Sequence, residues 1–207
     1  MLESHAATLP RDAPRAAPRS GGVKGNARLT GGVAAALLVL LAAEGATIPF
    51  IGQLLGPHVF IGMLLIPPVL LKLGSTGYRF VRYYSGSPAY VRKGPPHIAL
   101  RVLAPGVVFT TLALFGTGVG LLVAGPPSNT LMLAHKLSFI AWVALMTLHV
   151  LGHVLEVPAL ALPDWRRNGP PEARLAGAGA RTMTLGLAIL AGAALALLTY
   201  SAAGPWF

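Results

Sequence analysis

The chain has 207 residues, of which 54% are hydrophobic and 11% are charged, and its formal net charge is +10. A soluble domain carries about 25% charged residues, so this composition excludes an ordinary soluble protein and indicates a polytopic helical membrane protein. The chain has no cysteine, which excludes structural disulfides, cysteine-bound iron–sulfur clusters and covalent haem attachment through a C-x-x-C-H motif. The basic residues lie between the apolar segments, a pattern typical of membrane topology, and we expect no nucleic-acid partner.

The sequence predicts an all-α, polytopic membrane helix bundle with five transmembrane helices. Residues 1–28 are rich in Ala, Pro, Arg and Ser without an apolar run, so we expect them to form a disordered basic tail. Residues 29–207 are expected to form the bundle. Its predicted membrane spans cover residues 29–51, 57–78, 102–124, 130–156 and 182–200. Polar loops are expected at residues 78–101 and 158–181.

The positions of lysine and arginine predict the orientation of the bundle. Basic residues precede the first span and fill both polar loops, whereas the two other connections and the C-terminus carry no lysine or arginine. The positive-inside rule therefore predicts a multi-pass protein of the cytoplasmic membrane, with the N-terminal tail in the cytoplasm and the C-terminus outside.

The fourth span is apolar enough to cross a membrane, yet it contains three histidines. His135 and His149 are 14 residues apart, so on one α-helix they project from nearly the same face, about 21 Å apart along the axis. One imidazole would then lie near each edge of a hydrocarbon core roughly 30 Å thick. Ionisable side chains within a membrane usually mark a functional site, and neutral imidazole is a common axial ligand of haem iron.

An outer pair is expected from His58, at the start of the second span, and His135. On the predicted topology both histidines lie in the outer leaflet, on helices that can be neighbours, where they could bind one haem iron from opposite sides. Gly62 follows His58 by one helical turn and could give a flat macrocycle room to approach. The alternative is that His58 lies at the interface and His135 hydrogen-bonds a neighbouring helix.

An inner pair is less complete in the sequence. His149 or His153 would need a partner, and Lys72 stands where a second histidine of the second span would fall, 14 residues after His58. Lys72 could also extend to the inner headgroups or pair with a haem propionate. His97 is the other candidate ligand, although it follows Pro95 and could be a loop residue.

Two further groups of residues have open interpretations. His149, His153 and Glu156 share one helix face, with the spacing of a Zn²⁺, Fe or Mn site, but His153 and Glu156 could equally mark the point where the helix meets water. Glu44 and Lys136 both lie toward the outer side and could form an ion pair, or Lys136 could equally pair with a haem propionate. The aromatic and methionine side chains between the histidines of the fourth span are expected to serve packing.

The layout resembles bacterial di-haem cytochrome b proteins and ferric-reductase-like transmembrane bundles. The residues that carry the resemblance are His58, His135, His149 and the Thr117-Gly118 step, and the likeness covers the first four spans. It implies a four-helix haem-binding core plus one added helix. Lys72 departs from the di-haem pattern. The segment KLGSTGYRFVRYYSGSPAYVRKGPP is also similar to one found in small polytopic membrane proteins of this layout, which implies no activity.

From this resemblance we expect a b-type cytochrome that carries electrons within or across the bilayer through one or two bis-His haems b. If the protein is part of an enzyme, it would be the electron-transfer subunit of an oxidoreductase. The chain has no predicted flavin or nicotinamide domain, so electrons would come from quinol or a redox partner subunit. The alternatives are a non-redox membrane subunit or scaffold, and a membrane metal-binding protein that uses His149, His153 and Glu156.

Overall fold

The computed structural model describes residues 21–95, 97–126, 128–166 and 175–206, and every regular element in these ranges is a helix. The predicted all-α class is therefore confirmed. In chain order the elements are α1 (Gly22–Thr47), η1 (Ile48–Phe50), α2 (Ile51–Tyr84), α3 (Pro88–Lys93), α4 (Ile98–Ala124), α5 (Asn129–His153), α6 (Val157–Trp165), α7 (Ala178–Thr199) and η3 (Tyr200–Trp206).

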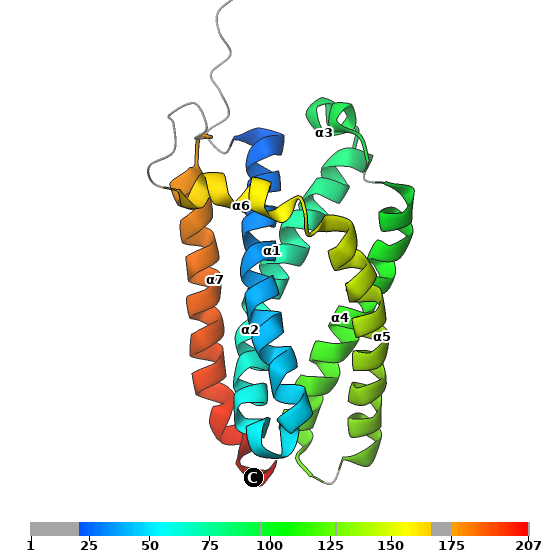
Figure 1. Ribbon diagram of the computed structural model, residues 1–207, viewed down its shortest axis with the longest axis vertical. Coiled ribbons are helices and arrows are strands. Elements are labelled where there is room, and N and C mark those ends of the chain that lie inside the picture. The colour runs from blue at the N-terminus through cyan, green and yellow to red at the C-terminus, as the bar shows by residue number, and fades with distance from the viewer. Residues whose placement is uncertain (1–20, 96, 127, 167–174, 207) are drawn as a thin grey trace, which may run out of the picture.

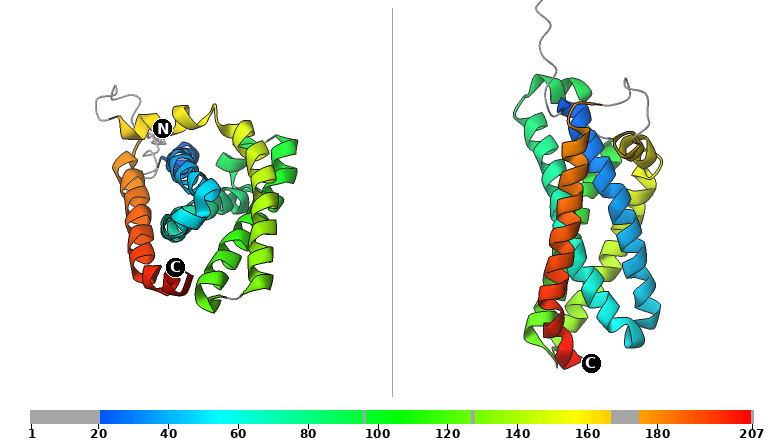
Figure 2. Two further views of the ribbon diagram at one scale, coloured as in Figure 1. Left: turned by 60° about the horizontal axis from the view of Figure 1, so that its bottom comes forward. Right: turned by 90° about the vertical axis from the view of Figure 1, so that its left-hand side faces the viewer.

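The long helices form an elongated bundle, with the short helices α3 and α6 at one end (Figure 1). The chain reverses at η1, so α1 and α2 run side by side in opposite directions. Viewed from the other end, α1 and α2 lie inside, with α7 on one side and the α4–α5 pair on the other (Figure 2). α7 packs mainly on α2, α6 crosses the end of α1, and α4 and α5 pack mainly on each other.

Four helical segments of the described chain are long and apolar enough to cross a membrane. The first, Gly22–Tyr84, contains both α1 and α2, and the others are Ile98–Ala124, Asn129–His153 and Ala178–Trp206. The sequence-based count of five spans treats α1 and α2 as separate crossings and stays a prediction. The antiparallel arrangement of these two helices is the feature on which that count depends.

The apolar core lies where α1, α2 and α7 meet. Its fully or largely buried members are Val33, Leu37, Leu65 and Leu185. Gly192 of α7 faces the backbone of Leu64 so closely that a Cβ atom at this position would overlap the Leu64 carbonyl. Small residues allow this kind of close helix approach in membrane proteins, where van der Waals contact replaces much of the hydrophobic driving force.

The first helix begins earlier than the sequence predicts. Residues 22–28 were expected to belong to the disordered tail, but α1 already begins at Gly22. The physical reason is tertiary contact: the Asn26 side chain donates to the Ser75 carbonyl at 3.2 Å, and Arg28 pairs with Asp164. The rest of the predicted tail, residues 1–20, lies outside the described residues.

The two predicted polar loops also contain short helices. α3 falls within the first loop and α6 within the second. α6 has the sequence VPALALPDW and packs against α1, with Ala161 buried. A nine-residue apolar segment is too short to cross a membrane, so hydropathy alone gave no reason to place a helix here.

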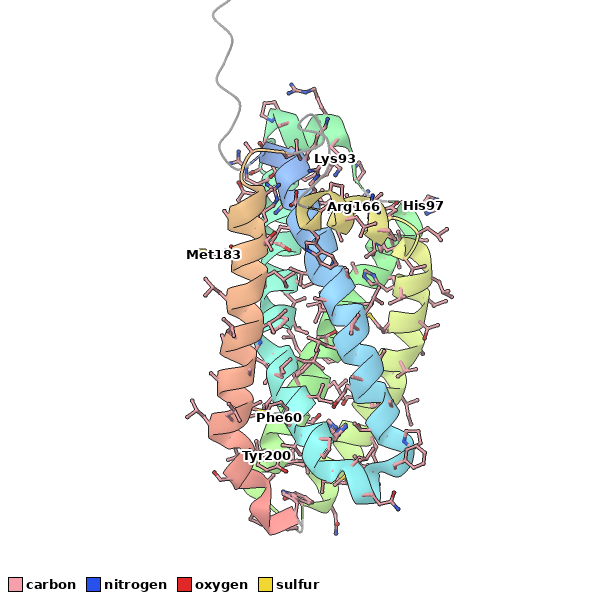
Figure 3. The ribbon with its side chains drawn as sticks, turned by 60° about the vertical axis from the view of Figure 1, so that its left-hand side comes forward. Phe60, Lys93, His97, Arg166, Met183 and Tyr200 are labelled. Atoms are coloured by element: carbon pink, nitrogen blue, oxygen red, sulfur yellow. The ribbon has the colours of Figure 1, made fainter. Side chains whose placement is uncertain are left out.

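The end of the bundle with α3 and α6 is the basic end. Lys93, His97 and Arg166 all lie there, whereas Phe60 and Tyr200 lie toward the opposite end (Figure 3). The rings of Phe60 and Tyr200 contact each other with centroids 6.4 Å apart, which joins α2 to η3. Lys93, His97 and Arg166 thus share the end of the bundle that carries α3 and α6.

A buried ion-pair network joins α1, α6 and α7 at the basic end. Asp164 accepts hydrogen bonds from Arg181, through Nε and through Nη2 at 2.9 Å, and from Arg28 Nη1 at 3.2 Å. Burial alone would raise the pKa of the Asp164 carboxyl, but the hydrogen bonds and charges of Arg181 and Arg28 outweigh burial and lower it. Arg181 also donates to the Ala176 carbonyl at 2.8 Å. This network holds α6 across the end of the bundle.

Candidate functional site

The structure brings His58 and His135 together, as the sequence predicts. His58 lies on α2, one residue after Pro57, and His135 lies in the second turn of α5. α2 and α5 both run from the η1 end of the bundle toward the basic end, so both histidines lie in its half opposite α3 and α6. Their ring centroids are 6.4 Å apart and their ring planes cross at 83°.

His58 is fixed by two residues of α1. Its Nδ1 atom lies 3.0 Å from Glu44 Oε1 and 3.0 Å from Thr47 Oγ1. The Thr47 hydroxyl itself donates to the Glu44 carbonyl at 2.6 Å. Because a hydroxyl has one proton, Thr47 Oγ1 can only accept from His58, and the Glu44 carboxylate is likewise an acceptor. The His58 proton therefore resides on Nδ1.

His135 is fixed in the same way by α4. Its Nδ1 atom lies 3.1 Å from Thr117 Oγ1, and the Thr117 hydroxyl is used in bonds to the carbonyls of Ala113, at 2.7 Å, and Leu114, at 3.0 Å. Thr117 therefore also accepts, and His135 carries its proton on Nδ1. Gly118 lies beside this ring: a Cβ atom there would be 3.3 Å from the imidazole Cε1. The absence of a side chain at Gly118 makes room for the ring.

The two threonine networks thus assign one tautomer to both histidines. With the proton on Nδ1, a neutral imidazole has its lone pair on Nε2, an atom that can bind a metal ion. Bonding of the other ring nitrogen to a hydroxyl, carbonyl or carboxylate is what orients histidine ligands in metal sites. The arrangement is therefore that of two oriented nitrogen donors on facing helices.

The spacing of the two rings fits a single iron atom between them. Two imidazoles on opposite sides of one metal ion have ring centres about 6.2 Å apart, because each metal–nitrogen bond is about 2.0 Å and each nitrogen lies about 1.1 Å from the ring centre. The observed separation of His58 and His135 is 6.4 Å. Their crossed planes are compatible with this geometry, since each ring can rotate about its own metal–nitrogen bond. Two imidazoles are a donor set that haem iron can take.

The packing around the pair shows which part of the bundle can adjust to a planar group. Within the described residues, no residue of α5 is buried, and α4 and α5 make few contacts with α1 and α2. An apolar cavity of about 240 Å³ lies along α5, lined by Trp142, Val143, Met146, Thr147, Val150 and Leu151, and it does not border the histidine pair. The α4–α5 pair is thus the more loosely attached part of the bundle.

The inner candidates form no comparable pair. His149 Nδ1 is buried and has no hydrogen-bond partner among the described residues. Its ring lies 4.9 Å from that of His153, the next histidine on the same helix. Lys72 Nζ donates to the Thr30 carbonyl at 2.9 Å, and His97 is exposed and accepts from the Ala99 N–H at 3.4 Å as the N-cap of α4. Each of the two proposed partners of His149 therefore has a bond of its own.

His149, His153 and Glu156, the residues of the metal-site alternative, lie near one another but do not form a ligand set for a metal ion. His153 Nδ1 is 3.8 Å from Glu156 Oε2, and the Glu156 side chain is 70% exposed. In the described part of the chain, no three histidine, aspartate or glutamate side chains form a group that could hold a metal ion. The structure gives this alternative no support.

Two sequence-based expectations around the outer site need correction. Glu44 was considered a partner of Lys136, but it lies beside His58, and Lys136 is exposed. Gly62 was expected to leave room for a macrocycle, whereas it faces the Glu44 carboxylate, with a Cβ position 3.5 Å from Oε1. Both differences come from the antiparallel packing of α1 on α2, which no local sequence spacing encodes. Trp142 donates to Thr111 Oγ1 at 3.0 Å, which joins α5 to α4.

Sequence reasoning missed the role of Glu44 and Thr47. These residues lie 14 and 11 positions before His58, on the other side of the η1 reversal. The one available signal was Glu44 itself, an acidic residue within an apolar helix, because an intramembrane carboxylate usually has a partner.

Compared with known protein families, curated proteins and solved structures, the chain has no match in any of the three. The site therefore rests on its own geometry.

Proposed function

We propose that this protein is an integral-membrane cytochrome of the b type, in which His58 and His135 bind one haem b. The observation that carries the proposal is the pair of imidazoles 6.4 Å apart, each with its proton held on Nδ1 by a threonine. A bound haem would supply one-electron chemistry by cycling between ferrous and ferric iron. The chain would set ligation, burial and position.

The proposed orientation follows from the basic end of the bundle. Arg28, Lys93, Arg101 and Arg166 belong to the end with α3 and α6, and we assign this end to the cytoplasm. The haem site then lies in the outer half of the cytoplasmic membrane. Electrons would come from quinol or from a redox partner subunit, and the haem would carry them within the bilayer.

One haem is favoured over two. His149 is the inner histidine on the face of α5 that carries His135, but Lys72 and His97 are engaged elsewhere. A single imidazole cannot complete the bis-histidine ligation that the outer pair offers. We therefore assign the outer site alone.

The test is a reduced-minus-oxidised absorption spectrum of the full chain, purified in detergent from cells supplied with ample haem. We expect one six-coordinate, low-spin haem b per chain. His58→Ala and His135→Ala are expected to lose it, whereas His153→Ala, on the same helix as His135, is the matched control and should retain it. A colourless wild-type protein refutes the proposal, and retention of haem by the His135→Ala variant refutes the ligand assignment.

A non-redox membrane subunit is the competing function. It is favoured by the same hydrogen bonds, because His58 and His135 each already bond a neighbouring helix through Nδ1. In this case the histidines would only join helices, and each such bond in a membrane protein contributes about 0.6 kcal/mol. The two functions are separated by the same preparation: the scaffold is colourless, and its His135→Ala variant loses a little stability and nothing else.

A further inference from the structure

The two histidines of the outer site have chemically different partners. His135 Nδ1 bonds one neutral hydroxyl, that of Thr117. His58 Nδ1 lies 3.0 Å from the hydroxyl of Thr47 and also 3.0 Å from a carboxylate oxygen of Glu44. The ligand set that the proposed function requires is thus asymmetric, with a charged group behind one imidazole only.

Glu44 is an unusual residue for its position. Among the acidic residues that the structure describes, it is the one that lies in the interior of a long apolar helix. Its side chain is 15% exposed, and its second oxygen, Oε2, is buried with no hydrogen-bond partner among the described residues. Placing a carboxylate within a membrane costs several kcal/mol, so a residue of this kind usually has a function.

The packing around Glu44 directs its charge toward His58. His58 is the basic side chain within ion-pair distance, since Lys136 is exposed and forms no ion pair in the described structure. Gly62 leaves the approach to Oε1 open, with its Cβ position 3.5 Å away. In this apolar surrounding a charge acts over a short distance with little screening.

We propose that Glu44 is a positioning residue that orients His58 and lowers the reduction potential of the iron bound there. The inference rests on the proposed function. A carboxylate that accepts the Nδ1 proton of a histidine ligand makes the imidazole more basic, and a more basic ligand favours the ferric state. The negative charge itself also favours the more positive ion. The Thr117 hydroxyl has no comparable effect on His135.

The experiment is a redox titration of the full-length wild type and of Glu44→Gln. Glutamine retains an amide oxygen that can accept from Nδ1, so this variant removes the charge and leaves the shape. We expect the equilibrium constant for reduction to rise at least tenfold, which is about 59 mV for a one-electron couple. Glu156→Gln is the matched control, because it removes a carboxylate that is 70% exposed and 3.8 Å from a different histidine. The reduction potential of the Glu156→Gln variant should equal that of the wild type.

The outcomes distinguish this inference from the proposed function. A colourless wild-type protein overturns both. If the wild type contains haem and Glu44→Gln has the same reduction potential, only the role of Glu44 is overturned. The same holds if Glu44→Gln loses thermal stability while its reduction potential is unchanged, because Glu44 would then have a structural role only.

If Glu44→Gln fails to retain haem, Glu44→Asp is the second variant, since it keeps the charge with a shorter side chain. Retention of haem by Glu44→Asp, with loss from a helical and folded Glu44→Gln protein, supports the positioning role. Loss from both folded variants assigns Glu44 to haem assembly and overturns the effect on potential. Thr47→Val removes the neutral acceptor alone, and its shift should be smaller than that of Glu44→Gln.

Discussion

The bundle contains two buried polar clusters that differ in how completely their groups are paired. At the basic end, Asp164 accepts from both Arg28 and Arg181, and the Arg181 guanidinium also bonds a backbone carbonyl. At the opposite end, His58 and His135 use one nitrogen each, and Glu44 keeps one oxygen without a partner in the described structure. A fully paired cluster is suited to holding helices together, whereas unused donor atoms are suited to binding a ligand.

The burial costs of the two clusters support this division. A network of buried charges is stable only when each charge is paired with an opposite charge. Removal of one partner leaves the remaining charges with the desolvation cost of burial and no ion pair to offset it. A ring nitrogen without a partner costs less than a buried charge without a partner. The first cluster therefore contributes to stability, and the second keeps reactive atoms available.

The largest expected effect is that of Asp164→Asn. It removes the charge that compensates Arg28 and Arg181 and should lower the free energy of unfolding by about 3 kcal/mol. Glu44→Gln, which leaves an amide oxygen beside His58, should lower the free energy of unfolding much less. Thermal unfolding in detergent, followed by circular dichroism, measures both. If the two variants lost equal amounts of thermal stability, the proposed difference between the clusters would be contradicted.

A smaller effect is expected from acid. The pKa of Asp164 is lowered in the folded protein by Arg181 and Arg28, so its contribution to stability is complete above its unfolded pKa of about 3.9. That contribution is lost as the pH falls through the lower folded value. The wild type should therefore lose stability below about pH 4, and the Asp164→Asn variant should lack this component. An unchanged acid slope in the variant would show that other carboxyls cause it.

The smallest effect is expected from alanine substitutions at two glycines of α4. They test how closely His135 of the second cluster packs against this helix. A Cβ atom at Gly118 would lie 3.3 Å from the His135 ring, whereas one at Gly116 would meet nothing within 4 Å. Alanine is the better helix former by up to about 1 kcal/mol, so Gly116→Ala should be neutral or slightly stabilising. Gly118→Ala should lose this gain and retain less haem, because the ring has to move by a few tenths of an ångström. Identical melting temperatures and haem contents would contradict the placement of His135.

Much of the architecture could be predicted because hydrophobic length and the positions of basic residues are local properties of the sequence. The long apolar segments and the positions of His58 and His135 near the same end of their helices follow from spacing along single helices. Helix ends and loop helices were not predictable in this way. α1 starts at Gly22 because Asn26 and Arg28 find partners far away in the chain, and α6 forms because its apolar side chains pack on α1.

The sequence by itself determined the helical class, the segments that carry the basic residues and the depth of each histidine along its helix, because periodicity and charge act within one helix or one loop. Only the tertiary structure decided that Glu44 stands behind His58 and that Lys72 bonds Thr30. It also decided that two threonines fix the imidazole protons. These relations depend on how α1 packs against α2 and how α4 packs against α5, and the contacts between helices are set by side-chain shape and hydrogen-bond direction across sequence distances that no local pattern records.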